Sequence, residues 1–131
     1  MTPLKAPLLA PPHRYAMQRT LIFAARVIAL LGIGFISMFA LDVLSMEAPL
    51  APRLAGFLVH LIPSFVLAGL LVVAWRWPGV GGALFLIAGL SPLLLLDNPL
   101  WTNLILGGPF LLAGAGFLAG RSGGATSPEP G

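Results

Sequence analysis

Long apolar runs separated by short polar breaks make up most of this chain. The runs cover residues 27–41, 54–75, 79–96 and 100–120, and charges hardly interrupt them. A helix needs about 20 residues to cross a hydrocarbon core of about 30 Å. The pattern therefore predicts an all-α fold, a four-transmembrane-helix bundle with spans at about residues 20–44, 54–76, 79–96 and 100–120.

The polar breaks carry the residue types expected where a helix leaves the membrane. Trp75 and Trp77 close the second run, and Pro78 follows them at once. Indole rings favour the headgroup level, and proline ends a helix. The turn sequence Asp97-Asn98-Pro99 closes the third run, and Trp101 opens the fourth at the opposite interface.

The chain divides into one membrane domain and two tails. Residues 1–18 are predicted to form a cytoplasmic tail, with a loose, proline-rich start. Residues 19–121 form the transmembrane domain, and residues 122–131, rich in glycine and proline, form a disordered cytoplasmic tail.

Basic residues predict the orientation of these spans. Successive tails and connections lie on alternate sides of the membrane. Six of the seven Lys and Arg residues fall on the side of the N-terminus, and only Arg53 falls on the other side. This bias predicts that both termini are cytoplasmic. The predicted topology and interface anchors are Arg19, Arg26, Arg76, Arg121, Trp75, Trp77 and Trp101.

Composition supports a membrane protein and excludes several other classes. The chain has 131 residues, is 58% hydrophobic and 8% charged, and has no cysteine, which rules out thiolate and Cys-metal chemistry. The basic residues are too few and too scattered for a nucleic-acid-binding surface. No nucleophile–base pair or phosphate-binding loop is evident, so we expect no enzyme activity and no cofactor.

A few polar groups lie near the predicted outer face. His60 lies inside the second span, and Ser64 follows one turn later, while Asp42 and Asp97 end the first and third spans. Two interpretations are open. These four residues form one polar cluster suited to a proton relay or a metal site. Alternatively, His60 is neutral and bonded to a neighbouring helix, and the aspartates lie at the headgroup surface.

Proline positions suggest kinks and a faint internal symmetry. Pro63, Pro92 and Pro109 each lie inside a predicted span, as simple kinks or as breaks that expose backbone groups. The sequences Leu67-Ala68-Gly69 and Leu112-Ala113-Gly114 recur after a proline in the second and fourth spans. Two explanations of this recurrence are open. The bundle consists of two tandem helical hairpins related by duplication, or the short matches arose by chance because leucine, alanine and glycine are abundant.

Several short motifs resemble a family of small bacterial four-span membrane proteins of unknown function. These motifs are Phe39-Ala40-Leu41-Asp42, His60-Leu61-Ile62-Pro63, Ala74-Trp75-Arg76-Trp77 and Gly81-Gly82. The resemblance covers roughly residues 20–121. It implies four helices in a bacterial plasma membrane, and it implies no activity, cofactor or catalytic residue.

Two hypotheses for function follow. The first is a structural or accessory membrane protein whose partners are the lipid bilayer and either itself or a larger membrane complex. The second is a minimal oligomeric transporter, or an ion or proton channel, that uses the polar cluster. Small multidrug exporters have a similar length, but they rely on a glutamate inside the first span. No glutamate lies in any predicted span here, so the first hypothesis ranks higher.

Overall fold

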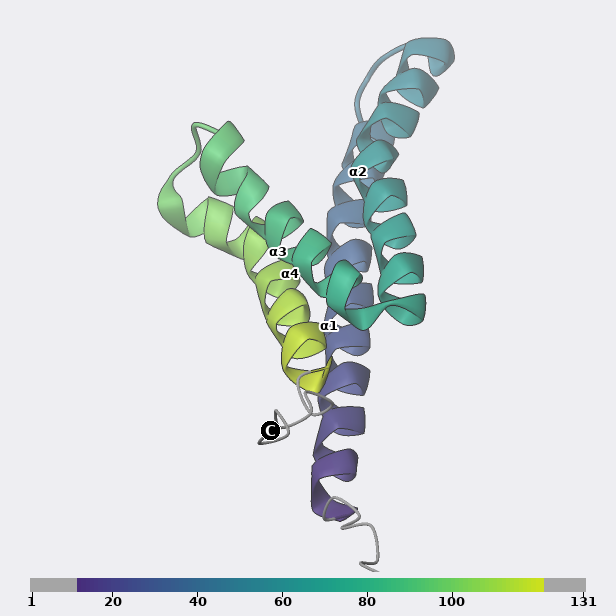
Figure 1. Cartoon of the computed structure of the whole chain (residues 1–131). Coiled ribbons are helices and arrows are strands. Elements are labelled where there is room, and N and C mark those ends of the chain that lie inside the picture. Colours follow the sequence, from purple (N-terminus) through teal and green to yellow (C-terminus); the bar gives the residue numbers. More distant parts are fainter. Residues whose placement is uncertain (1–11, 122–131) are drawn as a thin grey trace, which may run out of the picture.

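The computed structural model describes residues 12–121, and this part of the chain is four helices joined by short connections without a β-strand (Figure 1). The helices are α1 (Pro12–Leu44), α2 (Leu50–Arg76), α3 (Pro78–Leu95) and α4 (Leu100–Arg121). All four are long and apolar enough to cross a membrane. The all-α, four-helix prediction is confirmed.

The largest difference from the predicted boundaries is at the start of α1. This helix begins at Pro12 rather than near residue 20, so the juxtamembrane stretch continues directly into the first span. Proline suits a first helical position, because its missing N–H would have no helical partner there. Residues 1–11 and 122–131 lie outside the described part, and the flexible tails stay predictions.

The second helix also begins earlier than the pattern suggests. It starts at Leu50 and includes Pro52 in its first turn, where the N–H of Arg53 donates to the carbonyl of Pro49 at 3.2 Å. Proline is tolerated in a first turn, since it displaces no helical hydrogen bond there. The α1–α2 connection is therefore shorter than the run of polar residues implied.

Helix lengths differ more than a uniform bundle requires. The 33 residues of α1 make a rod of about 50 Å, whereas the 18 residues of α3 make about 27 Å. Figure 1 shows α1 extending past the other helices at its N-terminal end. α1 is therefore longer than the hydrocarbon core of a bilayer, while α3 is slightly shorter than one.

The helices form two antiparallel hairpins, α1–α2 and α3–α4, that share one packed region and then diverge (Figure 1). The main contacts run α1 to α2, α2 to α3, α3 to α4 and α4 back to α1. The α1–α2 and α3–α4 connections lie at the diverging ends. The start of α1 and the end of α4 lie on the opposite side, where α1 extends beyond the end of α4.

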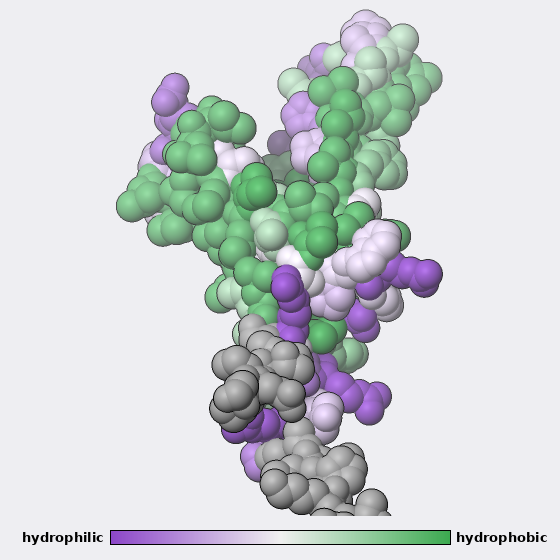
Figure 2. All heavy atoms as spheres, in the orientation of Figure 1, coloured by the Kyte–Doolittle hydropathy of each residue, from purple (hydrophilic) through white to green (hydrophobic). Residues whose placement is uncertain are grey.

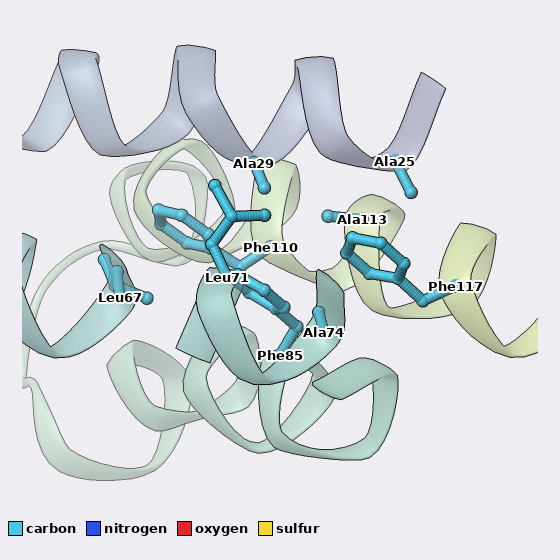
Figure 3. Packing of buried hydrophobic residues seen from close by; sticks show 9 residues of the cluster. All are labelled: Ala25, Ala29, Leu67, Leu71, Ala74, Phe85, Phe110, Ala113 and Phe117. Carbon is cyan, nitrogen blue, oxygen red and sulfur yellow. The ribbon is translucent and has the colours of Figure 1, made fainter. Parts of the chain in front are cut away.

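Three phenylalanines fill the shared region (Figure 3). The ring of Phe85 on α3 stacks between those of Phe110 and Phe117 on α4, with centroid distances of 6.1 and 5.9 Å. Ala25 and Ala29 present only methyl groups from α1, which lets that helix lie close to the rings. Large side chains on one hairpin thus fit against small ones on the other.

Glycines set the distance between α3 and α4. A Cβ on Gly82 would lie 3.0 Å from the carbonyl oxygen of Gly114, and a Cβ on Gly107 would overlap the carbonyl of Gly89. Gly82 and Gly89 are seven residues apart on α3, and Gly107 and Gly114 are seven residues apart on α4, so the two contacts lie on one face of each helix. The backbones of α3 and α4 therefore touch directly, as in other small-residue membrane helix pairs.

Candidate functional site

An open hollow lies between α1 and α2 near the tip of their hairpin. Its volume is about 560 Å³, and it contains the polar side chains of Asp42, Arg53 and His60. We call this the tip hollow; its remaining lining residues are Phe39, Val43, Met46, Ala48, Pro52 and Gly56. It brings one acid, one base and one imidazole together at the edge of the spans.

His60 is tied to its own helix. The side chain is exposed, and its Nδ1 lies 2.9 Å from the carbonyl oxygen of Gly56, one turn earlier. A carbonyl can only accept a hydrogen bond, so Nδ1 is the donor in this contact. The hydrogen bond that the structure shows for His60 is thus within α2 and not to a neighbouring helix, as had been expected.

Ser64 is separate from the tip hollow. It is buried, and its hydroxyl oxygen lies 2.9 Å from that of Ser37 on α1. The Ser37 hydroxyl also lies 2.8 Å from the carbonyl of Ile33. Because a hydroxyl has one proton, Ser64 donates to Ser37 when Ser37 donates to Ile33. This pair joins the first two helices inside the membrane-spanning part.

Asp97 does not join His60 and Asp42 either. It lies in the α3–α4 connection, at the tip of the other hairpin, and it does not line the tip hollow. Residues 12–121 contain no group of three or more His, Asp or Glu side chains that could hold a metal ion. The described part of the chain therefore does not bring the four residues together: Asp97 lies at the tip of the other hairpin, and Ser64, although it belongs to α2, bonds to Ser37 outside the tip hollow.

Asn103 is a buried polar residue that the sequence pattern did not single out. Its Nδ2 donates to the carbonyls of Leu96 and Asn98, at 3.2 and 3.3 Å. Its Oδ1 is buried without a hydrogen-bond partner in the described chain. Asn103 thus ties the first turn of α4 back to the α3–α4 connection. The polar residue three positions into an apolar span was the available signal.

The three prolines lie inside continuous helices. α2, α3 and α4 run on through Pro63, Pro92 and Pro109 respectively. Pro63 and Pro92 line a cleft of about 420 Å³ between the hairpins, walled also by Ile36, Leu95 and Phe110. We call this the hairpin cleft. Its lining is almost wholly apolar, so the prolines do not create a polar site of exposed backbone.

Aromatic and basic side chains gather at the opposite end of the spans. The guanidinium of Arg26 lies 4.7 Å from the ring centre of Trp75, and Arg76 and Trp77 follow Trp75 at the end of α2. Arg121 lies against Gly79 at the start of α3. We call these five residues, Arg26, Trp75, Arg76, Trp77 and Arg121, the basic end. Figure 2 shows hydrophilic side chains on this side, beyond the apolar band of the helices.

The other two predicted anchors are exposed. Arg19 is exposed on the part of α1 before Arg26, and Trp101 is exposed at the start of α4. Trp75 and Trp101 therefore mark two different ends of the spans.

The interior of the single chain has few polar side chains that could contact a polar substrate crossing the membrane. Ser64 and Asn103 are the only buried polar or charged residues of the described chain, and each bonds to a nearby group. The shared core between them is filled by phenylalanine, leucine and alanine. The described residues thus enclose no polar path from one end of the bundle to the other.

Comparison with known proteins assigns a family without an activity. A domain of unknown function, DUF7670, matches residues 14–124. The chain belongs to the DUF7670 family. No curated protein matches the chain, and no solved structure matches it. Membership of an uncharacterised family agrees with the resemblance seen in the sequence, while bacterial origin stays a prediction. The DUF7670 match covers α1 from residue 14 onward and the whole of α2, α3 and α4.

Proposed function

We propose that this DUF7670 protein is a packing subunit of the membrane, which associates with itself or with a larger membrane complex. The observation that carries the proposal is the low burial of its spans. In the most apolar 18-residue stretch of each helix, 17% of residues are buried in α1, 22% in α2, 22% in α3 and 39% in α4. Most of the apolar surface is thus open to lipid or to other helices.

Glycines that face outward indicate that other helices, and not lipid alone, contact this apolar surface. A Cβ added to Gly34, Gly69 or Gly108 would meet nothing within 4 Å. Small residues let helix backbones approach closely, which favours association in a solvent as apolar as the side chains themselves. The proposal includes no reaction and no cofactor, since the tip hollow holds no hydroxyl or thiol nucleophile beside His60.

The proposed location is a bacterial plasma membrane, with both termini in the cytoplasm. The start of α1 and the end of α4 lie on the same side of the molecule, which suits an even number of spans (Figure 1). The alternation of the spans along the sequence assigns six of the seven Lys and Arg residues to the side of the termini. Reporter domains fused after Gly131 and inserted at Glu47 should report opposite compartments. The same compartment for both would refute this topology.

Association is tested by replacing a glycine that faces outward. In lipid nanodiscs, we expect the wild type to be oligomeric or to retain a partner protein. We expect Gly69→Leu to reduce the associated fraction at least threefold, because the new side chain blocks close approach without meeting the chain's own atoms. Val72→Leu, at an exposed position of the same helix, is the matched control. A monomeric wild type without a partner would overturn the proposal.

The tip hollow supports a second candidate, an oligomeric transporter or a proton or ion channel. Its Asp42, Arg53 and His60 are charged or titratable groups around one open space. A liposome flux assay should compare wild type with Asp42→Asn and His60→Ala. Asp97→Asn is the control, because Asp97 lies outside the hollow. Flux lost in the first two variants and kept in the control supports this function; equal background flux in all four proteins ends it.

A further inference from the structure

The arginine nearest the middle of α1 has no acid to neutralise it. The Nε of Arg26 is buried without a hydrogen-bond partner in the described chain. The acids of that part, Asp42, Glu47 and Asp97, all lie in or beside the connections at the diverging ends of the hairpins. A partly buried cation in a membrane protein is costly without a counter-charge. Within residues 12–121, no acid supplies a counter-charge to Arg26.

Trp75 holds the Arg26 guanidinium through a contact that uses none of its hydrogen-bond donors. A cation–π contact occupies the face of the aromatic ring and uses none of the guanidinium N–H groups, which lie along the edge of the guanidinium. That edge matches the oxygens of a phosphate, which it can bind through two parallel hydrogen bonds. The contact with Trp75 thus fixes the orientation of Arg26 and prepares it for an anion.

Two further arginines add positive charge to the same end of the spans. Arg76 is the last residue of α2, and Arg121 lies against Gly79, the second residue of α3. An open hollow of about 400 Å³ is lined by Trp75, Arg76, Trp77 and two valines of α2. The level of these indole rings is the level of the lipid headgroups. Phosphate is the anion that is abundant at this depth.

We propose that the basic end binds the phosphate group of an anionic phospholipid, with Arg26 as its main ligand and with Arg76 and Arg121 adding charge around it. Basic pockets at the ends of membrane helices bind such headgroups in general. A zwitterionic lipid carries its own ammonium group beside the phosphate and is therefore bound less well. The site is independent of whether the protein associates with other helices.

The experiment measures lipid retention by the full chain. Protein is reconstituted with equal amounts of phosphatidylglycerol and phosphatidylcholine, extracted in mild detergent, and its bound lipids are counted by native mass spectrometry. We expect the wild type to retain phosphatidylglycerol at least fivefold over phosphatidylcholine. We expect Arg26→Gln to lower that preference to below twofold. Equal retention of the two lipids by the wild type would overturn the proposal.

Arg53→Gln is the matched control. The Nε of Arg53 is also buried without a hydrogen-bond partner in the described chain, but this residue shares the tip hollow with Asp42 at the other end of α2. We expect this variant to keep the wild-type preference. An equal loss in both glutamine variants would show a general effect of charge and contradict a site at Arg26. Circular dichroism checks that each variant is folded.

Two more arms identify the ligand. Arg26→Lys keeps the charge but loses the two-pronged edge, so we expect a lower preference than in wild type; full preference would contradict guanidinium recognition. Glu129→Gln, outside the described residues, should leave the preference unchanged. In a competition arm, 10 mM inorganic phosphate should not displace phosphatidylglycerol. Displacement by inorganic phosphate would assign the site to free phosphate instead of lipid.

Discussion

In the α3–α4 hairpin the two backbones touch through facing glycines, whereas α1 and α2 are joined through side chains. Gly82 faces Gly114 and Gly107 faces Gly89 in the first case. In the second, the two helices meet through the hydroxyls of Ser37 and Ser64. The α3–α4 hairpin is therefore held by close van der Waals contact over its length, and the α1–α2 hairpin by a local polar link.

The same contrast bears on the duplication hypothesis. Leu67 is 8% exposed, while Leu112, its counterpart in the repeated sequence, is 64% exposed. Gly69 faces open space, whereas Gly114 packs against the backbone of Gly82. Two hairpins are present, but the recurring residues lie in different environments. The structure thus favours a chance recurrence of abundant residues over an equivalent register in two copies.

The largest effect should come from filling a glycine contact of α3–α4. In Gly107→Ala, the new methyl overlaps the Gly89 carbonyl, which belongs to backbone and cannot rotate away. We expect a loss of about 3 kcal/mol in the free energy of unfolding, measured by SDS titration in mixed micelles. Gly69→Ala is the control, because nothing lies within 4 Å of its new methyl. Equal stability of the two variants would remove the contrast between the hairpins.

A smaller loss of stability is expected when the hydrogen bonds between Asn103 and the α3–α4 connection are removed. Asn103→Ala removes the donor that binds the carbonyls of Leu96 and Asn98. We expect a loss of about 1–2 kcal/mol, because buried hydrogen bonds to the backbone are lost. Amide exchange in the connection should also become faster. Thr102→Ala, a neighbouring polar-to-alanine change without such a bond, should alter neither quantity.

The smallest effect should come from the serine pair of α1–α2. Ser64→Ala removes one hydroxyl of the pair, and we expect a loss of about 0.6 kcal/mol, the average for hydrogen bonds between membrane helices. A double-mutant cycle with Ser37→Ala isolates the pairwise energy from the change in packing. A coupling energy near zero would show that the polar link does not stabilise this hairpin.

The candidate site was predictable only in part. His60 and Asp42 do share a hollow, as their positions near one face of the membrane suggested. Asp97 was expected with them because it ends a span on the same side, yet depth in the membrane does not fix the lateral position of a helix end. Arg53 was read only as a charge for topology, and its place beside His60 depends on how α1 packs on α2.

The sequence by itself determined the number of spans and most of their ends. Crossing a bilayer requires a minimum apolar length, and this property belongs to each segment alone. Pro78 and the tryptophans before it marked the α2–α3 boundary for equally local reasons. The start of α1 was missed, because a polar juxtamembrane segment can continue as helix without leaving a mark in the hydropathy pattern.

Tertiary structure alone decided which faces are inside. A helix that is apolar all round has no polar face to show which side it buries. Steric fit determines which faces are buried. Phenylalanines of α3 and α4 pack against alanines of α1, and glycine packs against glycine where the backbones of α3 and α4 meet. These pairings join residues far apart in the chain, so the divergence of the hairpins, and the separation of Asp97 from His60, follow from packing rather than from pattern.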